Sequence, residues 1–251
     1  MKNERSDETM SNNKEMKLLI EGFNTYLTEA IESREPVVTN NKQPEGELSS
    51  KTHSGIDEAA KFIHRSNEIE SYVEDIEDVV AALEGVAEGY PISYSTRSPY
   101  IKAQIEGIQA TVTFESRKGA TLAEAIEVHR AMGAAVLDSG VPGMLRDNNA
   151  SSSGGTVYVL PSFVAEAMSW WEMTNFESSF ERHAVYELIH PFADGNGRSG
   201  RILLLSNMNY DYSSVNKMIG ESYFNKLDGY NEKYQKYFRE MGWLKKIIYE
   251  K

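Results

Sequence analysis

The stretch HPFADGNGRSGR, from His190 to Arg201, holds most of the side chains in this chain that could do chemistry together. Gly195 and Gly197 flank Asn196, and glycine adopts positive φ angles readily, so the backbone can turn several N–H groups to one side. N–H groups placed in this way, just ahead of the positive N-terminal end of a helix, form an anion site. The pattern therefore favours a nucleoside polyphosphate as ligand.

The charged residues of the stretch agree with a phosphate ligand. Arg198 and Arg201 are three positions apart, so they share one face of a helix that we expect to begin near Arg198. Two cations at a helix N-terminus are mildly unfavourable unless a polyanion lies there. Asp194 would be repelled by phosphates unless a divalent cation bridges them, which predicts Mg²⁺ with few protein ligands. His190, at the end of the preceding helix, is a natural general base.

Other interpretations of the stretch explain less of it. GNGRSG also satisfies the dinucleotide pattern G-x-G-x-x-G, but that fold needs a strand on each side, and none follows Leu205. A P-loop is excluded because no GK[ST] follows the glycines. A plain glycine-rich turn with solvated arginines would explain the glycines alone. It would not explain a histidine, an acid, an asparagine and two arginines in the same stretch.

The stretch resembles the Fic motif, H-x-F-x-[DE]-G-N-G-R-x-x-R, at every defined position, and the flanking VYELIHPF and RILLL also look like a Fic core. Members of this family typically transfer AMP from ATP to a hydroxyl side chain of a protein. The resemblance implies that His190 deprotonates the target hydroxyl, that Phe192 anchors the loop in the core and that Asp194 holds Mg²⁺. It also implies that Arg201 binds the γ-phosphate of ATP. The full set of implied phosphate ligands is Gly195, Asn196, Gly197, Arg198 and Arg201.

An upstream segment, RSNEIES, resembles the inhibitory motif [ST]-x-x-x-E-[GN] of many Fic proteins. Ser66 and Glu70 match it, whereas Ser71 replaces the usual Gly or Asn, which leaves the end of this helix open. The resemblance implies that Glu70 pairs with Arg201 and takes the place of the γ-phosphate, so that ATP binds unproductively. A plain surface glutamate is the alternative, because S-x-x-x-E is a common pattern and Ser54 also begins one.

The expected fold class is mainly α, a Fic-type helical bundle with a small β-hairpin flap at about residues 154–160. In Fic folds this flap positions the target segment by strand addition. Alternation in IQATVTFE, residues 108–115, also predicts a strand. Capping boxes at Thr121 and Ser178 predict helix starts. His129 is interpreted as structural, as a lone histidine in a helix usually is. His183 lies seven residues before His190, but no third zinc ligand is apparent, so His183 is interpreted as structural too.

Hydrophobic periodicity and polar stretches divide the chain into three parts. These parts are a disordered N-terminus at 1–14, an N-terminal helix and linker at 15–54, and the Fic domain at 55–251. Within the last part we expect an inhibitory helix at about 55–71 and two C-terminal helices at 213–227 and 229–248.

Composition limits the partners. Lys+Arg number 26 against 38 Asp+Glu, and the resulting net charge of −12 argues against nucleic acid. There is no cysteine, and no apolar run approaches the ~20 residues of a membrane helix. The N-terminus also lacks the apolar region of a secretion signal. We expect a cytoplasmic protein without a membrane partner, with host delivery left open.

The predicted activity is that of a protein adenylyltransferase that uses ATP and Mg²⁺, is held back by Glu70 and modifies a Ser, Thr or Tyr hydroxyl of a protein substrate. Two alternatives stay open: an ATP-binding regulatory module with little transferase activity, and a Fic enzyme that uses another nucleotide or removes AMP. The sequence does not decide between a monomer and a homodimer.

Overall fold

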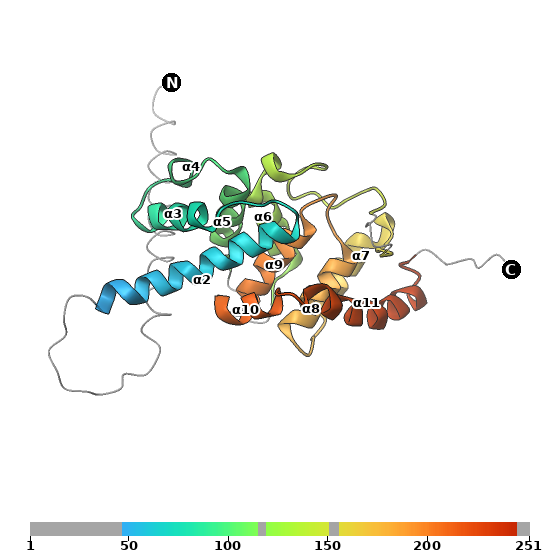
Figure 1. Cartoon of the computed structure of the whole chain (residues 1–251). Helices are drawn as coiled ribbons and strands as arrows, with labels where there is room; N and C mark the ends of the chain where they lie inside the picture. The colour runs from blue at the N-terminus through green and yellow to red at the C-terminus, as the bar shows by residue number, and fades with distance from the viewer. Residues whose placement is uncertain (1–46, 115–118, 151–155, 245–251) are drawn as a thin grey trace, which may run out of the picture.

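A computed structural model describes residues 47–114, 119–150 and 156–244, and these residues are mostly helical (Figure 1). The expected disordered segment at 1–14 and helix at 15–33 lie outside them. In chain order the helices are α2 (Glu47–Ile69), α3 (Ile76–Ala87), α4 (Ile92–Ser95), α5 (Pro99–Thr111), α6 (Leu122–Met132), the 3₁₀ turns η1 (Ala134–Val136) and η2 (Pro161–Phe163), α7 (Val164–Met173), α8 (Ser179–Ile189), α9 (Asn196–Asn207), α10 (Tyr212–Met218) and α11 (Tyr223–Glu240).

Helix α9 forms the centre of the bundle (Figure 1). It contacts α2, α5, α6, α8 and α10. Its run from Ile202 to Leu205 is buried on every side, with each side chain at most 2% exposed. A helix that is apolar all round is stable only inside a bundle. The central position of α9 fixes the start of the helix, where the motif glycines lie, between α2 and α8.

Helix α2 packs against α3, α5, α9 and α10 through a stripe of buried apolar residues. Ile56, Ala59, Ala60, Phe62 and Ile63 recur at helical spacing and are at most 6% exposed. The helix begins at Glu47, so the expected linker at 35–54 ends earlier than the sequence suggested. Its burial makes α2 a fixed part of the bundle rather than an appended segment.

Helix α2 ends in a Schellman motif built on Ser71. The Tyr72 N–H donates to the Asn67 carbonyl oxygen at 3.0 Å, and the Ser71 N–H donates to that of Glu68 at 2.9 Å. Ser71 has a φ of 66°, the left-handed conformation that glycine normally supplies at this position. The helix therefore ends immediately after Glu70 even though Gly or Asn is missing.

We expect Ser71→Gly to stabilise the protein by about 1 kcal/mol, because a left-handed residue with a Cβ is strained by roughly that amount. Urea denaturation measures the free energy of unfolding. Ser71→Ala is the matched control, since it removes the hydroxyl but keeps the Cβ, and it should give no such gain. Equal stability of the Gly and Ala variants would contradict a strained Ser71.

The strand expected at 108–115 is wrong, because α5 runs through its first half to Thr111. Ser98 caps this helix by accepting hydrogen bonds from the N–H groups of Tyr100 and Ile101, each at 3.2 Å. Ile101, Ile105 and Ile108 are buried at helical spacing. Tertiary packing of this stripe overrides the β-branched residues at the end of the segment.

The expected β-hairpin flap is only partly within the described residues. Residues 154–155 lie outside them, and no strand is formed from 156 to 160, which lead into η2. The bridge between Leu145 and Phe192 is an isolated one.

Near the C-terminus, the break between the last two helices falls at 219–222 rather than at 228, because α11 continues through Gly229 to Glu240. Throughout the described ranges, no helix has the length and apolar character that crossing a membrane requires.

The two predicted capping boxes differ. At Thr121 both reciprocal bonds are present. At Ser178 the hydroxyl oxygen accepts from the Glu181 N–H at 3.0 Å, but the Glu181 carboxylate accepts from the Glu177 N–H instead of the Ser178 N–H. Helix α8, which carries His190 at its end, therefore begins where the sequence predicts.

Candidate active site

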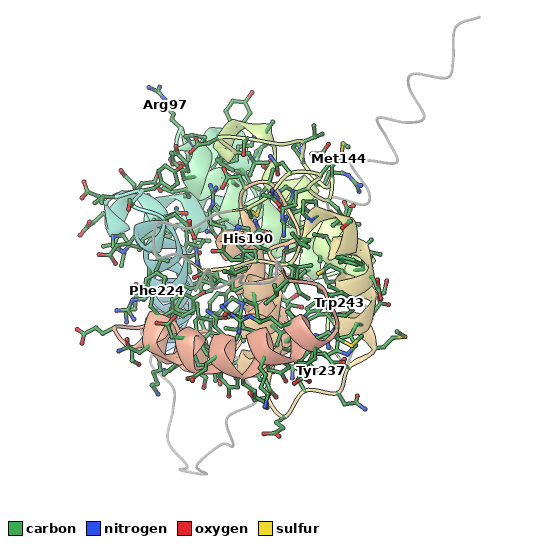
Figure 2. The ribbon with its side chains drawn as sticks, turned by 90° about the vertical axis from the view of Figure 1, so that its right-hand side faces the viewer. Arg97, Met144, His190, Phe224, Tyr237 and Trp243 are labelled. Atoms are coloured by element: carbon green, nitrogen blue, oxygen red, sulfur yellow. The ribbon has the colours of Figure 1, made fainter. Side chains whose placement is uncertain are left out.

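His190 is the C-cap of α8 and lies in the middle of the molecule (Figure 2). Its φ of 54° is left-handed, so the chain turns sharply and leads into the motif loop. The His190 Nδ1 lies 3.3 Å from the Glu187 carbonyl oxygen. A carbonyl can only accept, so Nδ1 carries the proton in this hydrogen bond and Nε2 keeps a lone pair. The imidazole is stacked on the Tyr158 ring, with centroids 4.1 Å apart.

The electrostatic surroundings keep His190 neutral. Burial lowers the pKa of His190 to about 4, against the opposing effect of the Glu187 carbonyl, and Arg146 lowers it further. A neutral imidazole with a free Nε2 lone pair can accept a proton at neutral pH. The geometry therefore supports the role of base that the sequence predicts for His190.

Phe192 and Asn196 hold the motif loop in its shape. Phe192 is fully buried and stacked on His129, with centroids 3.8 Å apart. The Asn196 side chain accepts from the Phe192 N–H at 2.8 Å and donates to the Phe192 carbonyl oxygen at 2.9 Å. Both ends of the Asn196 amide are thus engaged within the loop. Only its backbone N–H remains available to a nucleotide.

The start of α9 presents free N–H groups. The first i→i−4 bond runs from the Ser199 N–H to the Gly195 carbonyl oxygen at 3.0 Å. The N–H groups of Asn196, Gly197 and Arg198 precede it and belong to the unsatisfied first turn of a helix. The Gly195 N–H instead donates to Asp194 Oδ1 at 2.6 Å. Three of the predicted cradle residues therefore offer N–H groups to an anion, while Gly195 supplies the left-handed turn, with a φ of 73°.

Arg198 is a buried cation with free donors. It is 2% exposed, and its Nε and Nη1 have no hydrogen-bond partner in the described part of the chain. Its Nη2 lies 3.7 Å from Asp194 Oδ1. Unsatisfied donors on a buried charge are costly, so Arg198 is prepared for an additional acceptor. Phosphate oxygens are acceptors of the right kind.

Arg201 is also buried, but its donors are engaged by α2. Its Nε donates to Ser66 Oγ at 2.9 Å, and its Nη2 donates to the Ser66 carbonyl oxygen at 2.8 Å and to Glu70 Oε1 at 2.7 Å. The structure therefore brings together the two predicted inhibitory residues and the arginine assigned to the γ-phosphate. Glu70 remains 31% exposed at its side chain, so it can leave this pair towards solvent.

The Glu70 carboxylate also lies against the predicted anion site. A Cβ added to Gly197 would collide with Glu70 Oε1. The acidic group therefore lies directly against the first turn of α9, where N–H groups point outwards. A carboxylate at a helix N-terminus is stabilised there for the same reason that a phosphate would be. Glu70 and a phosphate group would compete for one place.

Sequence reasoning missed Arg146 as a site residue. This arginine is 4% exposed and donates to the carbonyl oxygens of His190, Asn148, Ile189 and Val159. It thereby holds the C-terminal end of α8, where a cation is favourable. Residue spacing alone does not place Arg146 against the carbonyl group of His190.

His129 makes structural contacts, because it joins the motif loop to the segment at Gly143. Its ring lies 2.9 Å from the Asp194 carbonyl oxygen through Nε2, and its Nδ1 accepts from the Gly143 N–H at 2.8 Å. His183 is structural as well. Its Nε2 lies 2.8 Å from the Tyr223 hydroxyl.

We expect the protein to lose stability as the pH falls from 7 towards 4, partly because of His183. Burial lowers the pKa of His183 to about 3, and Arg201 lowers it further. The unfolded chain therefore binds a proton near pH 6.5 that the folded chain refuses, so the free energy of unfolding falls by up to about 1.4 kcal/mol per pH unit for this residue. Urea unfolding at pH 7 and pH 5 measures the slope. His183→Asn should reduce it, and an unchanged slope would contradict this assignment.

Comparisons with known proteins agree with the geometry. The Fic/DOC family model matches residues 120–206. A probable protein adenylyltransferase of Aquifex aeolicus (strain VF5), aq_aa38, is 41% identical over 51 residues, which cover 19% of this chain and 16% of that protein. This chain thus spans only a small part of the curated relative.

Solved structures show a related fold at low identity. A Fic family protein from Desulfovibrio desulfuricans G20 has a TM-score of 0.50 and 19% identity, and the match covers 86% of this chain and 65% of that one. Fic-1 from C. elegans has a TM-score of 0.47 and 19% identity, over 90% of this chain and 68% of that one. The residues matched by the Fic/DOC family model, 120–206, include the whole motif stretch, and the Desulfovibrio protein shares the fold.

Proposed function

We propose that this protein is a protein adenylyltransferase that transfers AMP from ATP to a hydroxyl side chain of a protein and is restrained by Glu70. The observation that carries the proposal is the contact of Glu70 with both Arg201 and the first turn of α9, within the loop that begins at His190. Among the relatives, the Aquifex protein is a probable protein adenylyltransferase, which supports the same reaction class.

The chemistry follows from the positions of the donors. ATP would lay its phosphates along the N–H groups of Asn196, Gly197 and Arg198, with the free nitrogens of Arg198 donating to phosphate oxygens. The target hydroxyl oxygen attacks the α-phosphorus as its proton moves to His190 Nε2. The bond between the α-phosphorus and the α–β bridging oxygen then breaks, and pyrophosphate leaves with that electron pair. Preorganised donors offset the charge on the phosphates.

Asp194 fits a Mg²⁺ ion that is bound mainly by the nucleotide. Its carboxylate is 28% exposed and accepts from the N–H groups of Asp138 and Gly195. Each oxygen keeps a further lone pair. Within the described ranges no three His, Cys, Asp or Glu side chains gather as a metal site, so phosphates and water would supply the other ligands, as is common for Mg²⁺. The ion would neutralise phosphate charge.

In this proposal, autoinhibition follows because Glu70 and the γ-phosphate compete for Arg201. The γ-phosphate needs Arg201, and Glu70 holds it. ATP that binds beside an occupied Arg201 would have its phosphate chain displaced, so that the α-phosphorus is out of line with the attacking hydroxyl. The Arg201–Glu70 pair also gives a specific reason for the second candidate, an ATP-binding module that rarely turns over. The two candidates differ in whether removal of Glu70 releases transfer.

The proposal is tested by incubating the protein and cell lysate with Mg²⁺ and ATP labelled at either the α- or the γ-phosphate. Label on protein from α-labelled ATP alone would support AMP transfer, and its loss with a chelator would support the Mg²⁺ site. Label from γ-labelled ATP would identify a kinase instead. If neither ATP labels protein, repeating the assay with other labelled nucleotides, or with AMP-modified protein as substrate, separates the remaining Fic activities from a binding module.

A further inference from the structure

Arg182, in the first half of α8, is a buried cation with no counterion among the residues that the structure describes. It is 6% exposed, and its guanidinium carbon lies 4.1 Å from the centroid of the Trp171 ring. Its Nη2 donates to the Ala120 carbonyl oxygen at 2.5 Å and its Nη1 to that of Thr174 at 3.3 Å. Its Nε has no hydrogen-bond partner among the residues that the structure describes, and no described carboxylate lies within 4.0 Å.

The carboxylates around Arg182 are engaged elsewhere. Glu172 accepts from the Leu122 N–H at 3.0 Å, and Glu124 accepts from the Thr121 N–H at 2.6 Å to close the capping box of α6. Glu181 accepts from Lys233 and Tyr234. Burial lowers the pKa of Arg182 to about 10, although Glu172 and Glu124 act in the opposite direction. Among the described carboxylates, Glu172 and Glu124 therefore compensate the charge of Arg182 from a distance.

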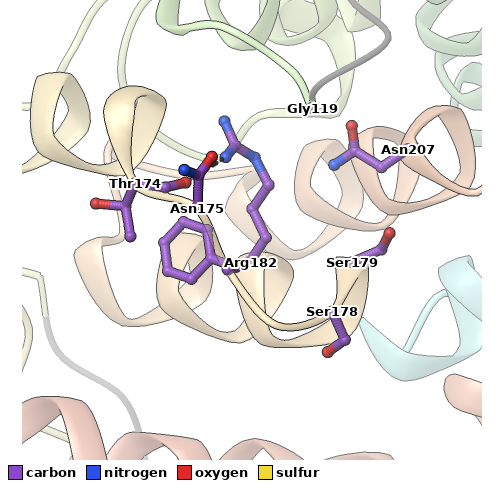
Figure 3. A pocket seen from close by; sticks show the side chains of 8 residues that line it. Gly119, Thr174, Asn175, Ser178, Ser179, Arg182 and Asn207 are labelled. Atoms are coloured by element: carbon purple, nitrogen blue, oxygen red, sulfur yellow. Dashed lines mark hydrogen bonds between the residues drawn. The ribbon is translucent and has the colours of Figure 1, made fainter.

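A polar hollow opens beside this guanidinium. It has a volume of about 210 Å³ and is lined by Arg182 together with Gly119, Thr174, Asn175, Phe176, Ser178, Ser179 and Asn207. Figure 3 shows the Arg182 side chain extending towards Gly119, with Asn175 on one side and Asn207 on the other. Ser178 and Ser179 are the N-cap and first residue of α8, so the positive end of that helix adds to the hollow.

Gly119 lies directly against the Arg182 guanidinium at the edge of the hollow. A Cβ added to Gly119 would lie 2.8 Å from Arg182 Nε and 2.9 Å from its Cζ. The glycine has a φ of +110°, which disfavours any side chain there. A side chain at position 119 would therefore collide with the Arg182 guanidinium, and glycine lets the backbone lie against it.

Two other buried arginines, Arg146 and Arg198, serve as comparisons for Arg182. Arg146 also lacks a carboxylate partner, but its three nitrogens donate to four carbonyl oxygens and none is left over. Arg198 has unpartnered nitrogens and lies where the motif would take phosphate. Arg182 combines a free nitrogen, a helix N-terminus and an adjacent hollow. In having a nitrogen without a described partner, Arg182 resembles Arg198 and not Arg146.

We propose that this hollow binds a small oxyanion, a phosphate or carboxylate group, through Arg182 and the first turn of α8. This second anion site is separated from the motif loop by the length of α8, which is about 16 Å at 1.5 Å per residue. The proposal does not depend on the activity of the motif loop.

The test is an amide NMR titration of the full chain with inorganic phosphate and, in a parallel sample, with acetate. We expect saturable shifts of amides in residues 174–182, and phosphate shifts at residues 195–198 report the motif loop separately. Saturation by phosphate alone, acetate alone or both supports the site and identifies the group. Shifts at 174–182 that stay linear in both titrations overturn it.

Two variants locate the ligand. Arg182→Met removes the cation, and Ser179→Leu fills the hollow without touching the hydrogen bonds of Arg182. Each should weaken binding at 174–182 by at least about tenfold, the size expected for loss of a charge-assisted hydrogen bond or of its space. Ser169→Leu, on the exposed side of α7, is the matched control and should bind as the wild type does. Unchanged affinity in Ser179→Leu would refute the site even if Arg182→Met failed to fold.

Discussion

Replacing Glu70 with glycine should raise AMP transfer by about tenfold to a hundredfold. The charge-assisted bond between Glu70 and the buried Arg201 is of a kind that contributes roughly 1.5–3 kcal/mol, and this preference must be overcome before the γ-phosphate can reach Arg201. Glycine also removes the oxygen that lies against Gly197. The rate of label incorporation from α-labelled ATP measures the effect, with the concentration of ATP varied to separate affinity from turnover.

Glu68→Gly is the matched control for this prediction. Glu68 is exposed, lies two residues earlier on α2 and carries the same charge. Its replacement removes one acidic group from the same helix end and introduces the same flexible residue, but it leaves the Arg201 pair in place. Equal activation by both variants would mean that loosening of α2, and not the carboxylate, controls transfer. No activation by Glu70→Gly, with ATP binding retained, would favour the binding module.

The helix–loop–helix arrangement around His190 to Arg201 was predictable because a single contiguous stretch encodes it. From His190 to Arg201 the residue types fix a loop between two helices whatever the rest of the chain does. The pairing of Glu70 with Arg201, 131 positions apart, was predicted through the family resemblance alone, and the bond from Arg201 to Ser66 was not predicted. Periodicity could place Ser66 and Glu70 on a helix, but it could not say what that helix faces.

What the sequence could not supply depends on tertiary packing. The segment at 108–115 has the alternation of a strand, yet the buried stripe of Ile101, Ile105 and Ile108 continues α5 into it. Arg146 and His129 support the loop through backbone carbonyl and N–H groups, which carry no sequence signal. The free Nε of Arg182 depends on where its neighbours' carboxylates are engaged, and only coordinates show that. Local patterns predict elements; they do not predict which charges are left without partners.

Loss of His190 should reduce transfer far more than loss of any other side chain of the site. A positioned general base contributes about 10²–10⁴-fold, and the free Nε2 of His190 is the base that the geometry offers. The measurement is best made in the Glu70→Gly background, where the starting rate is high enough for a fall of that size to be followed. ATP binding should persist, because the phosphate donors lie on α9.

The choice of substitution at His190 matters because its backbone is left-handed, with a φ of 54°. Alanine in that conformation is strained by about 1–2 kcal/mol, whereas asparagine tolerates it. His190→Asn therefore removes the base while keeping the turn, and His190→Ala removes both. If His190 acts as a base, the two variants should be equally inactive. Substantial activity in His190→Asn with little in His190→Ala would show instead that this residue serves the turn, and the proton would then have to leave by another route.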